Sequence, residues 1–221
     1  MIIDLGLIDY EDAYRVQKEF VVRRRLAEIG DTLIVAEHKP VFTIGRAGSK
    51  ANLLADEKFL NKSGIKVLDT DRGGDITFHG PGQLVAYPVI DLKVRGRDLH
   101  RYLRDLEEVA ISFLGRYSVS GQRRDGSTGV WVGDRKIASI GVGASDWVTY
   151  HGLSVNVNAD LNFFSMIYPC GMKDVKATSL NHVLGRKVSM DDAREKLLSC
   201  LCKVFCIGEA SIADSVPQAA S

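Results

Sequence analysis

The sequence predicts a single α+β domain whose mixed or antiparallel sheet is flanked by helices. The chain has 221 residues, 45% of them hydrophobic, which suffices for one substantial core. Its short β-rich runs come in pairs separated by turns, and helical patterns stand between groups of runs instead of alternating with single strands. The sequence shows no internal repeat or linker. We therefore expect one domain over residues 1–207 and a flexible C-terminal tail over residues 208–221.

The first half of the chain begins with an amphipathic helical pattern. Asp9 and Asp12 precede apolar residues at helical spacing, and Gly30 ends the pattern. This predicts a helix over residues 10–29 with acidic N-terminal caps and arginines that face water. Three β-branched runs then predict strands, the first two of them neighbours: residues 32–36, 41–44 and 65–68.

The second half contains the most regular helical pattern, over residues 98–114, which ends at Gly115 and is expected to serve packing. Two β-rich runs then stand on either side of Gly133-Asp134 and predict a β-hairpin. A further strand should join this hairpin, and a final helix should begin at a capping serine. The ranges of these elements are residues 128–132 and 136–140 for the hairpin, 153–157 for the strand and 189–205 for the helix.

Charge and termini limit the classes of function. The chain has 29 Lys+Arg and 28 Asp+Glu, a net charge of +1, without the strongly basic balance of most nucleic-acid-binding proteins. Its N-terminus lacks a secretion signal, and no apolar run is long enough to span a bilayer. We expect a cytoplasmic protein without nucleic-acid or membrane partners.

Three of the four cysteines, Cys200, Cys202 and Cys206, lie close together near the C-terminus. They lack a second C-x-x-C pair or a nearby histidine pair, so no structural zinc site and no other metal site is expected. We interpret them as small hydrophobic residues on a helix. In a cytoplasmic protein, all the thiols should be reduced.

The most unusual segment of the chain covers residues 71–88, with the sequence DRGGDITFHGPGQLVAYP. Gly73 and Gly74 follow Arg72, and glycines at such positions allow the backbone to approach a ligand closely or to adopt positive φ angles. The Gly80-Pro81-Gly82 run then reverses the chain between two β-rich pieces. We interpret the segment as a hairpin that grips a ligand.

Several side chains are candidates for chemistry, each with a simpler alternative. Cys170 lies in a Tyr-Pro-Cys-Gly turn, where its thiol is either a nucleophile presented to a cleft or a space-filling group. Catalysis would require a cation, a base or a helix N-terminus that lowers the thiol pKa from about 8.5. Lys136 starts an apolar run and is either a sheet-edge ammonium or an ordinary surface lysine. His79, His151 and Arg72 are candidates for a pocket, or else structural histidines and a surface cation.

Phosphate-binding motifs do not occur in the chain. Residues 45–50 lack Walker spacing, and residues 141–146 lack the third glycine of a dinucleotide fingerprint. Spacing therefore gives no reason to expect a nucleotide.

Taken together, these motifs resemble the octanoyltransferase (lipoyl(octanoyl) transferase) family of lipoate biosynthesis. The motifs occur in the same order as in the family and cover about residues 5–205. The family belongs to the biotin/lipoate protein ligase superfamily. The segments that carry the resemblance are residues 37–46, 72–79, 82–87, 128–132, 136–141, 151–153, 156–157, 169–171 and 178–180.

The resemblance implies a fold like the catalytic domain of biotin and lipoate protein ligases, and an acyl transfer in two stages without ATP or another cofactor. Octanoyl-acyl carrier protein would acylate Cys170 as a thioester. A lysine of a lipoyl domain would then accept the octanoyl group as an amide. The acceptors implied are lipoyl domains of 2-oxoacid dehydrogenase complexes and the glycine cleavage H protein. Lys136 matches the family's partner lysine, which lowers the pKa of the cysteine.

The family's substrate-binding positions correspond to Arg72, Gly73, Gly74, Asp75, Ile76, Thr77, Phe78, His79, Ser139, Ile140, Gly141, Gly152, Leu153 and Ser154. Two alternatives share the same expected fold: an ATP-dependent lipoate or biotin ligase, and a non-catalytic protein that binds acylated carrier proteins. Cys170 distinguishes the transferase from both. The sequence does not indicate the preferred lipoyl domains, the strictness of chain-length selection or the oligomeric state. Five cations are either docking groups for acidic carrier proteins or ordinary surface charges: Lys93, Arg95, Arg97, Lys173 and Lys176.

Overall fold

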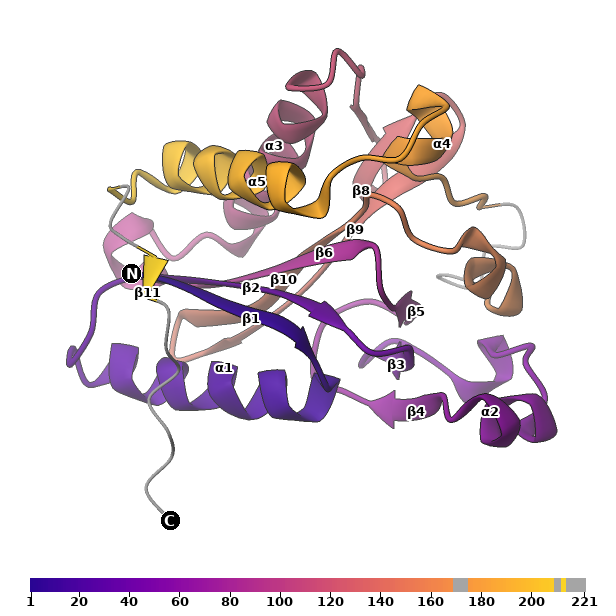
Figure 1. Cartoon of the computed structure of the whole chain (residues 1–221). Helices are drawn as coiled ribbons and strands as arrows, with labels where there is room; N and C mark the ends of the chain where they lie inside the picture. Colours follow the sequence, from indigo (N-terminus) through magenta and orange to yellow (C-terminus); the bar gives the residue numbers. More distant parts are fainter. Residues whose placement is uncertain (169–174, 209–211, 214–221) are drawn as a thin grey trace.

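The computed structural model describes residues 1–168, 175–208 and 212–213, which form two β-sheets with helices around them (Figure 1). The large sheet has eight strands in the order β11-β1-β2-β6-β10-β9-β8-β7, and the small sheet has three in the order β4-β3-β5. The strands of the large sheet are β1 (Ile2–Ile8), β2 (Thr32–His38), β6 (Gln83–Val89), β7 (Gln122–Arg124), β8 (Ser127–Val132), β9 (Arg135–Ser145), β10 (Val148–Asn156) and β11 (Ile212–Ala213). Those of the small sheet are β3 (Val41–Ile44), β4 (Lys66–Asp69) and β5 (Ile76–His79).

Both sheets are mixed. In the large sheet β1 runs parallel to β2 and β11, whereas the pairs from β2 through β6, β10, β9 and β8 to β7 are antiparallel. In the small sheet β3 runs parallel to β4 and antiparallel to β5. The predicted fold class, an α+β domain with a mixed sheet flanked by helices, is therefore confirmed.

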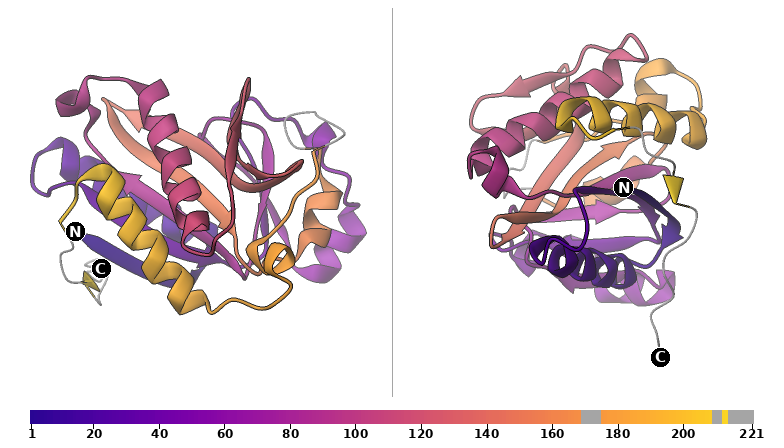
Figure 2. Two further views of the ribbon diagram at one scale, coloured as in Figure 1. Left: turned by 90° about the horizontal axis from the view of Figure 1, so that it is seen from above. Right: turned by 90° about the vertical axis from the view of Figure 1, so that its left-hand side faces the viewer.

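Helices cover both faces of the large sheet. Figures 1 and 2 show α1 on one face and the crossed helices α3 and α5 on the other. The helices are α1 (Tyr10–Arg25), α2 (Glu57–Ser63), α3 (Leu99–Gly115), α4 (Leu180–Leu184) and α5 (Met190–Phe205), with short 3-10 turns η1 (Lys50–Asn52), η2 (Leu92–Arg95) and η3 (Leu161–Met166). Among the described residues, no helix is both long and apolar enough to cross a membrane.

The central strand β6 explains why both faces need cover. All seven of its residues are buried, and successive side chains point to opposite faces. Leu84 and Ala86 join the core beneath α3 and α5, whereas Val85 and Tyr87 join the core beneath α1. A separate hydrophobic cluster that includes Phe42 forms the core of the small sheet.

Elements with strong local signals are confirmed. The predicted helix at residues 98–114 is α3, and the Asp98 side chain accepts the Arg101 N–H as its N-terminal cap. The predicted hairpin is β8 and β9, and β10 joins it. The final helix is α5, capped by Ser189. Within the predicted tail, Ile212–Ala213 form β11 and pair with β1.

The prediction for the first helix is wrong at its end and for Arg24, whereas Arg15 and Arg25 are exposed as expected. The helix ends at Arg25, four residues early, because the chain turns there and Ala27 adopts a positive φ of 56°. Arg24 does not face water, since its guanidinium lies 2.9 Å from the Asp31 carboxylate and 3.5 Å from that of Asp91. Asp9 precedes the helix but makes no side-chain cap, and its carboxylate pairs with Lys39 instead.

Two strand pairings expected from closeness in sequence are also wrong. β2 and β3 are consecutive, but β2 pairs with β1 and β6, and β3 pairs with β4 and β5. The segment at residues 71–88 is not a hairpin, because β5 belongs to the small sheet and β6 to the large one. The chain therefore crosses between the sheets twice, at Lys39-Pro40 and at Gly80–Gly82, and the candidate site lies where the two sheets meet.

Candidate functional site

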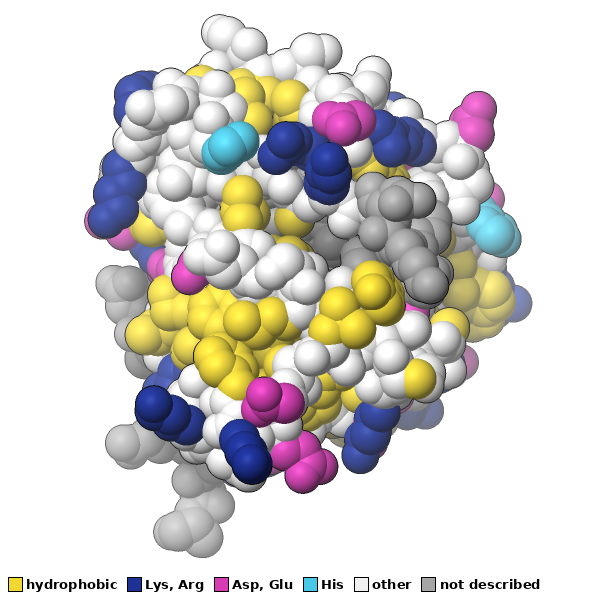
Figure 3. Space-filling model, turned by 90° about the vertical axis from the view of Figure 1, so that its right-hand side faces the viewer, with side chains coloured by type: hydrophobic (Ala, Val, Ile, Leu, Met, Phe, Trp, Pro, Cys, Tyr) yellow, Lys and Arg dark blue, Asp and Glu magenta, His cyan; other side chains and the backbone are white. Residues whose placement is uncertain are grey.

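A cavity of about 500 Å³ lies between the large sheet and the loop that leads into β5. Residues of β9 and β10, the loop at residues 72–75 and the β7–β8 turn line it. All the predicted substrate-binding residues except Phe78 are among its lining residues, together with Lys136. Figure 3 shows one face of the molecule, where hydrophobic side chains gather across the middle with lysines and arginines above and below them.

Lys136 lies on β9, directly after the β8–β9 turn. Its ammonium donates a hydrogen bond to the Thr128 carbonyl at 3.0 Å and lies 5.0 Å from the centre of the Trp131 ring. Its backbone N–H donates to the Lys176 carbonyl, and its carbonyl accepts the Thr178 N–H, each at 2.8 Å. The residue is half-buried, and its side chain lines the cavity.

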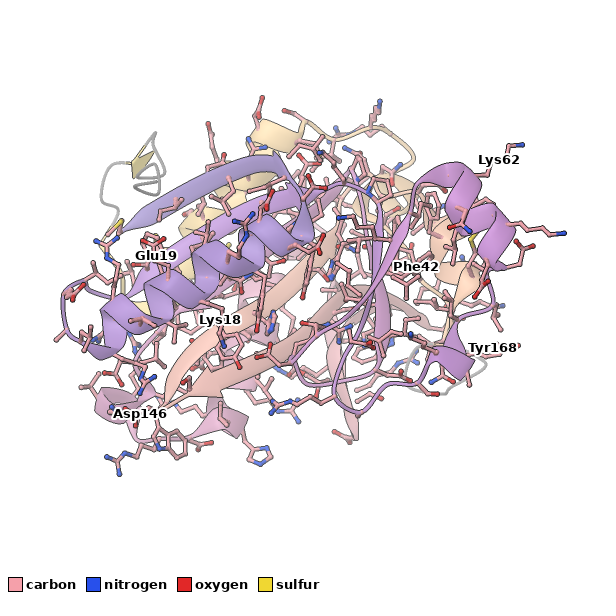
Figure 4. All side chains as sticks on the ribbon, turned by 90° about the horizontal axis from the view of Figure 1, so that it is seen from below. Lys18, Glu19, Phe42, Lys62, Asp146 and Tyr168 are labelled. Atoms are coloured by element: carbon pink, nitrogen blue, oxygen red, sulfur yellow. The ribbon has the colours of Figure 1, made fainter. Side chains whose placement is uncertain are left out.

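Cys170, the predicted nucleophile, lies outside the described residues. On its N-terminal side, the Tyr168 N–H donates to the Asn52 carbonyl at 2.8 Å, and Figure 4 places Tyr168 beside the small sheet, far from Asp146. On its C-terminal side, Lys176 pairs with Lys136 through the backbone. Before the gap the described chain thus lies beside the 3-10 turn η1 at Tyr168, and after the gap it resumes alongside β9, next to the candidate lysine.

Arg72 is buried, with only 7% of its surface exposed, so its interpretation as a surface cation is wrong. Its guanidinium donates to the Thr43 carbonyl at 2.7 Å, to the Thr43 hydroxyl at 2.9 Å and to the Gly73 carbonyl at 3.0 Å. The Gly73 N–H donates to the Val142 carbonyl at 2.8 Å. Arg72 and Gly73 therefore tie the loop to β3 on one side and to β9 on the other.

Glycines allow this loop to lie against its neighbours. A Cβ on Gly141 would lie 2.7 Å from the Gly73 carbonyl oxygen, and one on Gly45 would lie 2.4 Å from that of Gly74. Gly152 on β10 has a φ of +158°, and a Cβ there would lie 2.4 Å from the Ala86 carbonyl oxygen. The close approach that glycines permit is here one of backbone to backbone.

His79 is buried at the inner wall of the cavity. Its Nδ1 bonds to Gln83 Oε1 at 2.7 Å, and because an amide oxygen only accepts, Nδ1 carries the proton. Gln83 in turn donates to Asn156 Oδ1 at 2.9 Å. Burial lowers the pKa of His79 well below its usual value. His79 is therefore a neutral imidazole in the folded protein.

His151 also lines the cavity, in a left-handed conformation with a φ of 55°. Its Nε2 donates to the Asp71 carboxylate at 2.8 Å, and its backbone N–H donates to Gln17 Oε1 at 2.8 Å. Burial lowers the pKa of His151 to about 4, although the bond to Asp71 opposes this shift. Partial burial raises the pKa of Asp71, but hydrogen bonds from His151, Tyr150 and Tyr14 outweigh it and lower the pKa to about 2. The contact therefore joins a neutral imidazole to a carboxylate.

Three residues of this region were not predicted: His38 and the cavity-lining Tyr10 and Tyr87. His38 Nδ1 donates to the Ile8 carbonyl at 3.1 Å, and its Nε2 accepts the Tyr87 hydroxyl at 2.6 Å. Burial lowers the pKa of His38 to about 4. The Tyr10 ring stacks on His79 with centroids 5.7 Å apart. His38 and Tyr87 lie within two of the segments that carry the family resemblance, residues 37–46 and 82–87, and this was the signal that the sequence offered for them.

Two of the predicted substrate-binding residues make contacts that stabilise the small sheet and the turn beside it. Phe78 is buried and stacks on Phe163 with ring centroids 4.4 Å apart, inside the core of the small sheet. Asp75 lines the cavity but accepts hydrogen bonds from Asn52 Nδ2 and the Ile76 N–H, each at 2.6 Å. These bonds hold the 3-10 turn η1 against β5.

The predicted docking cations differ in exposure. Arg95 donates to the Phe205 carbonyl at 2.8 Å and to Asp31 at 3.1 Å, so it joins η2 to the end of α5. Lys93 pairs with Asp146 at 2.6 Å. Arg97 and Lys176 are exposed, and Lys173 lies outside the described residues.

Comparison with known proteins identifies the family of this chain. The model of the lipoyl protein ligase A/B catalytic domain matches residues 9–202. An octanoyltransferase from Rubrobacter xylanophilus is 50% identical over 196 residues, 88% of each chain. One from Caldicellulosiruptor bescii is 45% identical over 203 residues, 91% of this chain and 89% of that protein.

Solved structures agree on the fold. A lipoate-protein ligase A bound with ATP matches with a TM-score of 0.72 at 14% identity, over 97% of this chain and 87% of that one. A putative lipoate protein ligase from T. acidophilum with bound lipoic acid matches with a TM-score of 0.68 at 15% identity, over 93% and 85%. The chain belongs to the lipoyl protein ligase A/B catalytic-domain family, and its resemblance to the octanoyltransferases within that family is confirmed.

Proposed function

We propose that this protein transfers an octanoyl group from octanoyl-acyl carrier protein to a lysine of a lipoyl domain, through a thioester on Cys170. The Cys170 thiolate attacks the thioester carbonyl of the donor, and the carrier thiol leaves with a proton. The acceptor amine then attacks the acyl-enzyme, forms the amide and releases the Cys170 thiolate. The observation that carries this proposal is the cavity, where Lys136 and the positions matched to the family lie together.

The energetics of the proposal require no ATP. Exchange of one thioester for another is nearly isoenergetic, and conversion of a thioester into an amide runs downhill. Cys170 is the feature that distinguishes the transferase from the ATP-dependent ligase, because only the proposed transfer needs a thiol to carry the acyl group.

We assign to Lys136 the role of keeping Cys170 ionised. An ammonium near a thiol favours the thiolate, and each unit by which the thiol pKa falls corresponds to about 1.4 kcal/mol. Lys136 would also relay protons, to the leaving carrier thiol in the first stage and from the incoming amine in the second. Its place in the cavity wall, with its backbone bonded to Lys176 a few residues beyond Cys170, supports this assignment.

The acyl chain has an apolar place in the cavity. Ile140, Val142, Leu153 and Val85 are among the lining residues, and each buried methylene contributes about 0.8 kcal/mol to binding. Backbone N–H groups would stabilise the oxyanion of each tetrahedral intermediate. The Gly73 N–H already donates to Val142, so we assign this role to N–H groups other than that of Gly73.

The acyl-enzyme can be tested by mass spectrometry after incubation with octanoyl-carrier protein. The wild type should gain one octanoyl group that hydroxylamine removes, and Cys170→Ala should gain none. Cys206 is an exposed free thiol, so Cys206→Ala is the matched control and should be acylated like the wild type. An unmodified wild type would overturn the transferase, and ATP-dependent formation of an acyl-adenylate would support the ligase instead.

The lysine can be tested through the rate of thiol alkylation measured against pH. Lys136→Ala should raise the pKa of the Cys170 thiol and slow acylation. Lys62 projects away from the molecule in Figure 4, so Lys62→Ala is the matched control and should leave both unchanged. An alkylation profile of Lys136→Ala that coincides with that of the wild type would refute the assigned role.

A further inference from the structure

Three residues of β8 surround the Lys136 side chain. The Thr128 carbonyl accepts the ammonium at 3.0 Å. Gly129 has a φ of +134°, and a Cβ there would lie 2.6 Å from Lys136 Cε and 2.7 Å from the Ala138 carbonyl oxygen, so a larger residue would displace the lysine stem from its present position. The Trp131 ring lies 5.0 Å from the ammonium, within the distance at which a cation is attracted to the face of an aromatic ring.

An irregularity in the hairpin creates the pairing of tryptophan and lysine. Val130 is paired with Ala138, and in regular register Trp131 would pair with Ile137. The register shifts between Val130 and Trp131, so Trp131 instead lies opposite Lys136. Such bulges re-aim side chains. Here the bulge makes the ring and the ammonium cross-strand neighbours.

The indole is present at a cost to folding. Trp131 is 1% exposed, and its Nε1 is buried without a hydrogen-bond acceptor among the described residues. An unpaired buried N–H is unfavourable, and a phenylalanine would fill most of the same space without this cost. Tryptophan offers the strongest aromatic face for a cation, which gives a reason for its presence that packing alone does not.

Helix α3 supports the strand residues that surround the Lys136 side chain. Glu107 is a buried carboxylate, 1% exposed, and it accepts the Gly129 N–H at 3.1 Å. Arg104 at 2.7 Å and Arg123 at 3.1 Å pair with its other oxygen. Glu107 therefore fixes the backbone of Gly129 and, with it, the adjoining Thr128 carbonyl.

Several other charged residues in the described part of the chain lie near Trp131, Lys136 and the hairpin turn. The Arg124 guanidinium carbon on β7 lies 5.5 Å from the centre of the Trp131 ring. Lys176 meets Lys136 through its backbone carbonyl. Asp134 and Arg135 pair with each other at 4.0 Å in the turn. The Trp131 ring attracts the ammonium although the ring carries no formal charge.

We propose that Trp131 is a positioning residue for this reaction, whose ring face keeps the Lys136 ammonium charged and holds it in place for its assigned role. This inference rests on the proposed function, because it acts through the role assigned to Lys136. A merely structural tryptophan would affect stability. A positioning tryptophan must also affect the ionisation of the Cys170 thiol, and must do so only while Lys136 is present.

The test is the pKa of the Cys170 thiol, obtained from the rate of alkylation by iodoacetamide against pH in the full chain. Trp131→Leu removes the ring face and should raise the thiol pKa by about half a unit to one unit, which slows alkylation below that pKa by about 3-fold to 10-fold. Trp131→Phe keeps a weaker face and should shift the pKa by less. If Trp131→Leu fails to fold, Trp131→Met, which also lacks a π face, is measured in its place.

The decisive arm repeats the substitution in Lys136→Ala. There Trp131→Leu should cause no further shift, because two residues that act through one interaction are not additive. Equal shifts in both backgrounds, or Phe and Leu variants that behave alike, would overturn the inference. If Lys136→Ala raises the thiol pKa but Trp131→Leu does not, this inference alone is overturned. A Lys136→Ala without effect overturns the lysine's assigned role and this inference together.

Discussion

Substitution of Gly141 by alanine tests whether the cavity depends on contact between two backbones. Gly141 lies on β9 opposite the loop at residues 72–74, and a Cβ there would lie 2.7 Å from the Gly73 carbonyl oxygen. Ordinary contact begins at 3.4 Å, so the loop and the strand would have to separate by roughly 0.7 Å. The backbone of Gly141 itself is unstrained for alanine, because its φ is not positive. Steric displacement is therefore the expected effect.

The size of the effect follows from how the loop is held. Gly73 donates to Val142, next to the substituted position, so separation stretches a 2.8 Å hydrogen bond. Overpacking of this kind costs about 1–3 kcal/mol of stability. The displaced loop also lines the cavity, and a displacement near 1 Å at a site can cost about 100-fold in rate. We therefore expect a loss of transfer rate of about 10-fold to 100-fold, beyond the loss of stability.

The assay compares kcat/KM for octanoyl-carrier protein with the midpoint of thermal unfolding. Gly115→Ala is the matched control, because Gly115 ends α3 with nothing within 4 Å of a Cβ, and its φ is not positive. The control should stabilise the protein by about 0.4–1 kcal/mol and leave transfer unchanged. A Gly141→Ala protein with both the stability and the kcat/KM of the wild type would refute the reasoning.

Three further predictions concern residues around the site. Burial lowers the pKa of His38 from 6.5 to about 4, so the unfolded chain takes up the proton first and stability should fall from pH 6.5 toward pH 4, by about 3 kcal/mol at most. Urea unfolding against pH measures this loss, which should shrink in His38→Gln; parallel curves would contradict it. Phe78→Leu should lower stability by about 1 kcal/mol and leave the KM for the donor unchanged, because this ring lies in the core of the small sheet. Arg95→Ala should cost about 1–3 kcal/mol of stability without weakening carrier-protein affinity, whereas loss of affinity without loss of stability would restore Arg95 as a docking cation.

Local signals explain which elements could be predicted from the sequence. The apolar period of α3 and its Asp98 cap lie within one continuous segment, and the Gly133-Asp134 turn joins strands that pair with each other. Partners of strands such as β3 are not local, and nothing in residues 32–44 indicates that β2 and β3 belong to different sheets. The burial of the Arg24 side chain likewise depends on Asp31 and Asp91, which lie outside the helix and bind its guanidinium.

The candidate site shows the same division. Arg72 and its glycines stood out because their composition is unusual for a strand, and Lys136 was found through the family's motif. Tyr10, His38 and Tyr87 lie in an ordinary helix and ordinary strands, and they meet only because α1, β2 and β6 converge there. Residues 37–46 and 82–87 carry the family resemblance, but no feature local to one of these elements indicates that Tyr10, His38 and Tyr87 come together.

The position of the cavity follows from the two crossings of the chain between its sheets. At Lys39-Pro40 and at Gly80–Gly82 the chain passes from one sheet to the other, so β5 and its preceding loop lie against β9 and β10 without belonging to their sheet. Two sheets that are not joined edge to edge leave a space between them. The Arg72 guanidinium holds the loop against Thr43 of β3, and the Gly73 N–H holds it against Val142 of β9. The glycines at positions 45 and 141 then allow the loop to approach both sides to within contact. We infer that the width of the cavity is set by the backbone of the loop and the sheet, so that a side chain added at Gly141 should change the shape of the cavity more than a substitution among the apolar side chains of its lining.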